Sequence, residues 1–180
     1  MILFNSFVSF FIISGLLLSC DVYAQTAEDY LDRGNAYYKQ SYYAKAVSDY
    51  TKAIDIDPNI TKAYNNRGVI YAELGYLTES IADFTMAIAN NPNDAEAYNN
   101  RGHSYAKQGN LSDSIADFTH AIQINPNYTK AYINRALSWY NTKEYTKAWL
   151  DVYKAEELGG TINPNFLEDL KKASDQASNK

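Results

Sequence analysis

Residues 63–68 read Ala-Tyr-Asn-Asn-Arg-Gly, and the same six residues stand again, unchanged, at 97–102. Residues 80–85 read Ser-Ile-Ala-Asp-Phe-Thr and are likewise repeated at 114–119. Both intervals are 34 residues long. A fixed interval of this length is typical of supersecondary units that stack and bury their apolar faces against one another. The interval therefore predicts a fold built from stacked repeats, and other residues of the chain recur with the same 34-residue spacing.

The 34-residue phase extends over four units. Each unit holds an arginine, followed by a small residue, and an aspartate that stands 16 residues after the arginine. These residues are Arg33, Arg67, Arg101, Arg135, Asp49, Asp83, Asp117 and Asp151. Apolar residues recur at intervals of three or four within each half of a unit, which is the period of a helix. Each unit is therefore predicted to be two antiparallel helices joined by a short turn.

Glycine, proline and asparagine indicate where these helices end and begin. Gly75 and Gly109 stand between the two helices of their units, where glycine is favoured as a helix C-cap. A proline closes each of the first three units, and an asparagine follows each proline; the asparagines are Asn59, Asn93 and Asn127. Because asparagine is a favoured N-cap residue, these three are predicted to cap the helix that follows.

The pattern resembles the tetratricopeptide repeat, with its aromatic fourth, eleventh and twenty-fourth residues, small eighth residue, alanine at position 27 and late proline. The resemblance implies an all-α fold: a solenoid of antiparallel helix pairs that forms a right-handed superhelix with a C-terminal capping helix. The predicted units are residues 27–60, 61–94, 95–128 and 129–162, followed by the capping helix at 163–176. Arginine replaces the usual leucine at the seventh position, and Val152 replaces the last aromatic residue.

The composition excludes several classes of function. The net charge is −5 and the basic residues do not cluster, so a nucleic-acid partner is not expected. One cysteine and two histidines leave little material for a disulfide framework, a metal site or acid–base catalysis. No nucleophile–base pair or glycine-rich phosphate loop is present. The sequence therefore predicts a protein that is not an enzyme and needs no cofactor or metal.

Residues 1–24 are predicted to be a signal peptide. Residues 1–19 contain no charged side chain, and Asp21 is the first charge in the chain. This stretch is short for a membrane span, which needs about 20 residues. Val22 and Ala24 are small residues at the two positions that export peptidases prefer, so cleavage is predicted after Ala24.

Two alternatives for this segment remain open. Residues 17–20 (Leu-Leu-Ser-Cys) resemble a bacterial lipobox, which makes Cys20 the lipidated first residue of a lipoprotein, although no Lys or Arg precedes the apolar run. The segment is otherwise a retained membrane anchor. All three interpretations place the folded part outside the cytosol, in the periplasm or as a secreted protein, and limit any membrane contact to this segment.

The repeated arginines and aspartates are interpreted as structural ion pairs rather than as a site. Each arginine lies on the first helix of its unit and each aspartate on the second, so the two side chains are expected to meet across the pair and leave no partly buried charge unpaired. A catalytic or ligand role does not require four identical copies.

The resemblance places the candidate site on the concave surface, which the first helix of each unit lines. Asparagines recur there at the fifth and sixth positions, and a row of asparagines can bind the backbone of an extended peptide because an amide both donates and accepts. The candidate groove residues are Asn35, Asn65, Asn66, Asn99, Asn100, His103, Asn134, Leu137 and Tyr140. Solvation of the asparagines, and packing of Leu137 and Tyr140 against the terminal helix, are the favoured alternatives.

Two functions follow from this surface. The leading hypothesis is a non-catalytic interaction module, an exported scaffold whose groove binds an extended peptide or a helix of another protein. The alternative is a structural subunit that assembles an envelope complex through its convex face or its array ends. Charges in the groove alternate in sign, so a strongly acidic partner tail is not expected. The sequence leaves the oligomeric state open.

Overall fold

The computed structural model describes residues 25–178. Every regular element in this part of the chain is an α-helix, and none of these helices is long and apolar enough to cross a membrane. The predicted signal peptide, with its alternative lipidation site at Cys20, lies outside the described residues.

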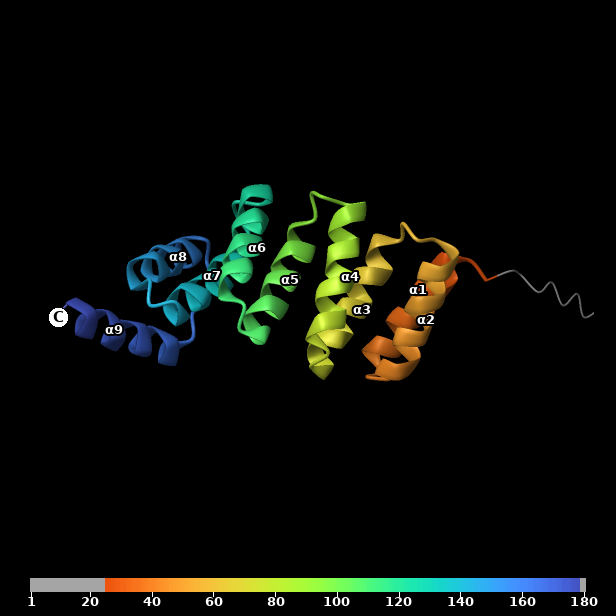
Figure 1. Ribbon diagram of the computed structural model, residues 1–180, viewed down its shortest axis with the longest axis horizontal. Coiled ribbons are helices and arrows are strands. Elements are labelled where there is room, and N and C mark those ends of the chain that lie inside the picture. Colours follow the sequence, from red (N-terminus) through yellow and green to blue (C-terminus); the bar gives the residue numbers. More distant parts are fainter. Residues whose placement is uncertain (1–24, 179–180) are drawn as a thin grey trace, which may run out of the picture.

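Four helix pairs follow one another along the long axis of the molecule (Figure 1). They are α1 (Ala27–Lys39) with α2 (Tyr43–Ile56), α3 (Thr61–Leu74) with α4 (Leu77–Asn90), α5 (Ala95–Gln108) with α6 (Leu111–Ile124), and α7 (Thr129–Asn141) with α8 (Tyr145–Glu157). A ninth helix, α9 (Pro164–Ser178), lies at the opposite end of the array from α1 (Figure 1). The predicted all-α solenoid with a C-terminal helix is therefore confirmed.

Within each unit, the small residue of the first helix lies against a large residue of the second. A Cβ atom added at Gly102 would lie 2.9 Å from the ring of Phe118, which is closer than real Cβ contacts. The same close approach occurs in the first two units, between Gly34 and Tyr50 and between Gly68 and Phe84. The fourth unit has Ala136 and Val152 in these places, and both are fully buried. The departure from the aromatic pattern thus follows from size, since the larger Ala136 needs a smaller partner.

This complementarity makes the two positions energetically coupled. We expect Gly102→Ala to lower the free energy of unfolding by about 1–3 kcal/mol, because the added methyl group overpacks the contact. The double variant Gly102→Ala/Phe118→Val should be destabilised by at least about 1 kcal/mol less than the sum of its two single changes. Urea unfolding of the four proteins measures this coupling, and strict additivity would contradict it.

The turn between paired helices uses the left-handed backbone conformation in every unit. Gly75 and Gly109 adopt it with φ of 83° and 87°, and the equivalent residues of the first and fourth units, Ser41 and Lys143, adopt it with φ of 60° and 65°. Glycine takes this conformation with the least steric strain; in the two units without glycine, α1 and α7 end one residue earlier relative to the turn and are 13 residues long.

The prediction that Asn59, Asn93 and Asn127 cap the next helix is wrong. Each asparagine lies inside a four-residue turn that begins at Asp57, Asn91 or Asn125, whose side chain accepts a hydrogen bond from the asparagine N–H. The proline occupies the second position of this turn, which its fixed φ favours. The helix therefore starts only after the turn, and α5 is capped by Asp94.

Candidate functional site

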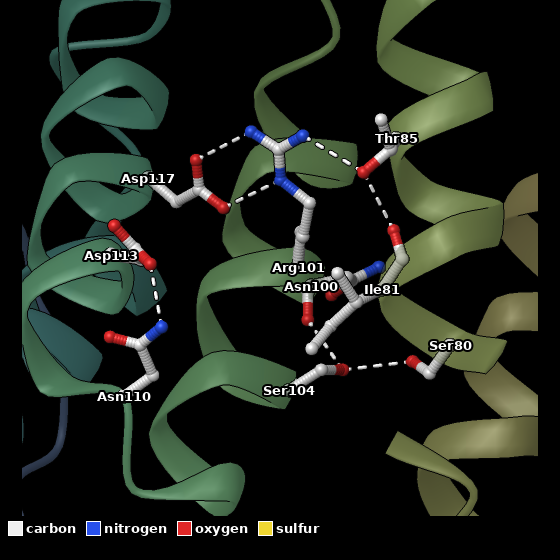
Figure 2. A network of polar contacts seen from close by, with 9 residues as sticks. All are labelled: Ser80, Ile81, Thr85, Asn100, Arg101, Ser104, Asn110, Asp113 and Asp117. Carbon is white, nitrogen blue, oxygen red and sulfur yellow. Dashed lines mark hydrogen bonds and ion pairs between the residues drawn. The ribbon is translucent and has the colours of Figure 1, made fainter. Parts of the chain in front are cut away.

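The repeated arginines form the polar framework that holds the units together. The guanidinium of Arg101 donates from Nε and Nη2 to the two carboxylate oxygens of Asp117 at 2.8 Å, and from Nη1 to Oγ1 of Thr85 at 3.1 Å (Figure 2). Asp117 belongs to the same unit, whereas Thr85 belongs to the preceding one. Arg67 and Arg135 make the same three bonds, with Asp83 and Thr51 and with Asp151 and Thr119 respectively.

Comparison of the first unit with the later three shows how much a preceding unit adds to the burial of the arginine. Arg33 pairs with Asp49 through two hydrogen bonds of 2.6 and 2.8 Å, and these bonds lower the pKa of Asp49 below its usual value. No unit precedes the first within the described residues, and the side chain of Arg33 is 39% exposed, against 15–17% for the other three arginines. The preceding unit therefore covers more than half of the arginine surface that the arginine's own unit leaves exposed.

Tyrosine rings flank the same guanidinium groups. The guanidinium carbon of Arg101 lies 5.6 Å from the ring centre of Tyr98 and 5.9 Å from that of Tyr105. Arg67 lies equally between Tyr64 and Tyr71, at 5.9 Å from each. The electron-rich face of an aromatic ring attracts such a cation. The placement accounts for part of the high tyrosine content, because tyrosine recurs at the positions on either side of the arginine.

The threonines that bind the arginines also recur in the sequence, and this recurrence indicates their role. Thr51, Thr85 and Thr119 recur with the 34-residue interval, two residues after the repeated aspartate. The corresponding residue of the fourth unit is Tyr153, which is 59% exposed and faces no further arginine-bearing unit in the described chain. The threonine is thus absent only from the last of the four units, where no later arginine needs it, and this absence indicates that the threonine makes a contact between units rather than within one.

Two buried serine pairs form a second connection between units. Oγ of Ser80 lies 2.8 Å from Oγ of Ser104 (Figure 2), and Oγ of Ser114 lies 3.0 Å from that of Ser138. The first junction has Ala46 and Ile70 in these places, both fully buried. Among the junctions between the four units, the serine contacts therefore occur only at the two that follow the second and third units.

We expect the threonine bond to contribute measurably to stability. Thr85→Val removes the acceptor for Arg101 and should lower the free energy of unfolding by about 1 kcal/mol. Asp117→Ala leaves the half-buried guanidinium without its carboxylate and should cost about 3–5 kcal/mol. Thr78→Val, at an exposed position in the first turn of the same helix, is the control and should stay within about 0.5 kcal/mol of the parent. Equal stability of the Thr85 and Thr78 variants in urea unfolding would contradict the proposed role of the bond.

The concave side contains two adjoining hollows between α1, α3 and α5. The larger, of about 350 Å³, is lined by Asn35, Tyr38, Lys39, Asn66, Val69 and Glu96. The smaller, of about 210 Å³, is lined by Val69, Ala72, Glu73, Phe84, Asn100, His103 and Lys107. Val69 lines both, so the hollows adjoin along the groove. Four of the predicted site residues, Asn35, Asn66, Asn100 and His103, lie here.

Each asparagine at the sixth position forms a hydrogen bond with another asparagine, either the preceding residue or one in the preceding unit. Nδ2 of Asn66 donates to Oδ1 of Asn35 at 2.7 Å, and Nδ2 of Asn134 donates to Oδ1 of Asn99 at 3.0 Å. Oδ1 of Asn100 accepts from Asn99 at 3.3 Å. Within residues 25–178, Oδ1 of Asn66 and Nδ2 of Asn100 make no hydrogen bond to another residue. Each of the two side chains thus keeps one free hydrogen-bonding group in the groove.

The fifth-position asparagines have a different environment. Asn99 is 5% exposed, and Asn65 donates to Oδ2 of Asp94 at 2.9 Å in the loop before α5. Oδ1 of Asn65 is buried and has no hydrogen-bond partner among the described residues. The residue equivalent to Asp94 in the next unit is Tyr128, which cannot replace the carboxylate, and Asn99 pairs with Asn100 and Asn134 instead. Asn65 therefore contacts the residue that caps α5 and Asn99 contacts the fourth unit, and neither side chain lines the two hollows.

The other candidates differ in exposure. His103 is exposed but lines the smaller hollow, where partial desolvation and then the charge of Lys107 lower its pKa below the usual value. Tyr140 packs edge-to-face on Phe166 of α9, with ring centres 5.6 Å apart, while Leu137 is 39% exposed. Tyr140 is thus a contact of the terminal helix, and Leu137 remains accessible.

One acid and one base lie in each hollow. The larger holds Lys39 and Glu96, and the smaller holds Glu73 and Lys107. The hydroxyl of Tyr38 donates to Oε1 of Glu73 at 2.8 Å; burial and this bond raise the pKa of Tyr38 to about 12. No cluster of three or more His, Cys, Asp or Glu side chains that could hold a metal ion occurs between residues 25 and 178.

Comparisons with known proteins agree with this geometry. The family model described as tetratricopeptide repeat matches residues 95–128, and a second, described as TPR repeat, matches 34–75 and 70–109. These matches together span more than half of the chain, and the chain belongs to the tetratricopeptide repeat family. A comparison with curated proteins finds no match.

Several solved structures share the fold. A crystal structure of MamA is 24% identical, covers 75% of this chain and 79% of its own, and has a TM-score of 0.72. The first TPR of Spaghetti (RPAP3), bound to the HSP90 peptide SRMEEVD, is 27% identical, covers 66% and 94%, and has a TM-score of 0.64. The OM64 TPR domain of Arabidopsis is 28% identical, covers 64% and 96%, and has a TM-score of 0.63. The fold of this family is a scaffold for protein–protein interaction, and its members are typically non-catalytic.

Proposed function

We propose that this chain is an exported, non-catalytic scaffold whose concave groove binds an extended segment of a partner protein. The observation that carries the proposal is the pair of hollows on either side of Val69, each with one asparagine that keeps a free group. Asn66 offers an acceptor for a peptide N–H, and Asn100 offers a donor for a peptide C=O. Asn66 and Asn100 lie on α3 and α5, the first helices of successive units, so they can both hydrogen-bond a peptide backbone that runs along the array.

The RPAP3 relative supports a peptide as the ligand, since that protein is bound to a seven-residue segment of HSP90. The bound sequence, SRMEEVD, contains three acids and one base. In this chain each hollow contains both a lysine and a glutamate, so a predominantly acidic segment gains little net attraction here. The proposed ligand is therefore an extended segment, without preference for an acidic tail.

Randomised twelve-residue peptides displayed on phage, panned against the full chain, test the groove. We expect the selected peptides to lose at least about tenfold in affinity against Asn66→Ala/Asn100→Ala, the magnitude of one or two hydrogen bonds. The control is Asn127→Ala, an exposed asparagine in the loop before α7.

Thermal unfolding shows whether the double variant remains folded. Peptides that bind the parent and the double variant equally would contradict the groove and move the contact elsewhere. The exposed Leu150 and Tyr153 on α8, at 64% and 59% exposure, are then the surface to examine, as the assembly alternative requires.

Export is proposed on the N-terminal sequence alone. The apolar residues 1–19 and the small residues before position 25 support cleavage after Ala24, with Cys20 lipidation and a retained anchor as the alternatives. Mass spectrometry of the protein purified from its native host distinguishes them, because cleavage leaves Gln25 at the N-terminus and lipidation leaves a diacylated Cys20. Recovery of the intact chain from a cytosolic fraction would contradict export.

A further inference from the structure

Charged side chains occupy both walls of the groove with regular alternation. We assign the second residue of each first helix to one wall and a residue in its last turn to the other, because Glu96 at the second position and Lys39, Glu73 and Lys107 in the last turns line the hollows. Along the first wall the residues are Glu28, Lys62, Glu96 and Lys130. Along the second they are Lys39, Glu73 and Lys107. All seven are exposed, and four of them line the two hollows.

Helix stability explains only part of this arrangement. An acid in the first turn and a base in the last turn both complement the helix dipole. Helices α1 and α5 follow this rule, with Glu28 and Lys39 and with Glu96 and Lys107. Helix α3 reverses it, since Lys62 lies in its first turn and Glu73 in its last. The order of charges in α3 is therefore not explained by its own dipole: Glu73 accepts a hydrogen bond from Tyr38 of the preceding unit, and the exposed Lys62 is left to contacts outside the helix.

The walls can be related to an extended chain by simple geometry. Packed helices lie about 10 Å apart and an extended chain rises about 3.3 Å per residue, so one unit corresponds to about three residues of ligand. Side chains of an extended chain alternate between sides. A residue that faces the second wall at one unit is therefore followed, three positions later, by a residue that faces the first wall at the next unit.

This alternation sorts the groove charges by sign. A ligand residue opposite Lys39 is followed at three-residue steps by residues opposite Lys62, Lys107 and Lys130. A ligand residue opposite Glu28 is followed in the same way by residues opposite Glu73 and Glu96. Because the walls and the signs both alternate, one set of every third ligand residue meets only lysines and another set meets only glutamates.

We propose that the groove selects an extended, charge-rich but nearly neutral segment of a partner protein, with one acidic and one basic residue in every three. The inference rests on the proposed peptide-binding function and adds the chemistry of the ligand. At each unit the acidic and the basic ligand residue are neighbours in sequence and face opposite walls. Either order of the two residues, and either direction of the ligand chain, therefore places acids opposite lysines and bases opposite glutamates.

Three synthetic peptides of twelve residues test the charge spacing, with affinity for the full chain measured by fluorescence anisotropy. The first consists of four repeats of Glu-Lys-Thr. The second has the same composition, with its four glutamates, four threonines and four lysines grouped in blocks. The third replaces every Glu and Lys by Gln. We expect the first to bind at least about tenfold more tightly than the other two, the sum of several weak ion pairs, and to lose this advantage as salt is raised.

The variant Lys62→Glu/Glu73→Lys provides the matched test in the protein. It keeps the net charge and gives α3 the dipole-compatible order of α1 and α5, while it removes the exposed bond from Tyr38 to Glu73. We expect its melting temperature to be unchanged or raised. We also expect its preference for the Glu-Lys-Thr peptide over the block peptide to fall at least about threefold, as the ion pairs at one unit become repulsive.

The outcomes separate this inference from the proposed function. Equal binding of the three peptides, or an unchanged preference in the α3 variant, overturns the charge pattern while binding that depends on Asn66 and Asn100 stands. A groove that binds none of the peptides and yields no asparagine-dependent sequence from the phage library overturns both.

Discussion

One buried cation in each repeat constrains the rest of the structure. An arginine at a position where a helix pair would otherwise place an apolar side chain requires a carboxylate across the pair, since a half-buried charge without a partner is strongly destabilising. It also requires aromatic faces rather than aliphatic walls, and an acceptor for its remaining amino group. The aspartate, one or two tyrosine rings and the threonine of the preceding unit supply these groups for Arg67, Arg101 and Arg135.

The groove depends on this framework because the first helices that line it also carry the arginines. Fixing the helix pair within a unit and the contact between units sets the separation of the first helices. That separation in turn sets the spacing of Asn66 and Asn100 and of the wall charges. Stability and recognition are thus divided between two faces of the same helices.

Most of the architecture could be predicted from the interval alone, because residues in contact within a unit recur together. The glycine beside each aromatic ring, and the arginine 16 residues before each aspartate, belong to such contacts. Contacts between units were harder to predict: the threonine that binds Arg101 lies on another unit, and Ser80 and Ser104 have equivalents at only one other junction. The helix starts were mispredicted because the proline turn already uses the amide of the asparagine. The pairing of Asn99 with Asn134 depends on Tyr128 in place of an aspartate, which a position-by-position pattern does not show.

Tyr153 has a consequence for how such an array can grow. Each copy of the second or third unit contains both an arginine that donates to the threonine of the preceding unit and a threonine that accepts from the arginine of the next unit. Duplication of the fourth unit would place Tyr153 where the incoming arginine otherwise meets a threonine. Tandem duplication therefore keeps the arginine–threonine contact between units when an interior unit is copied and loses it when the fourth unit is copied.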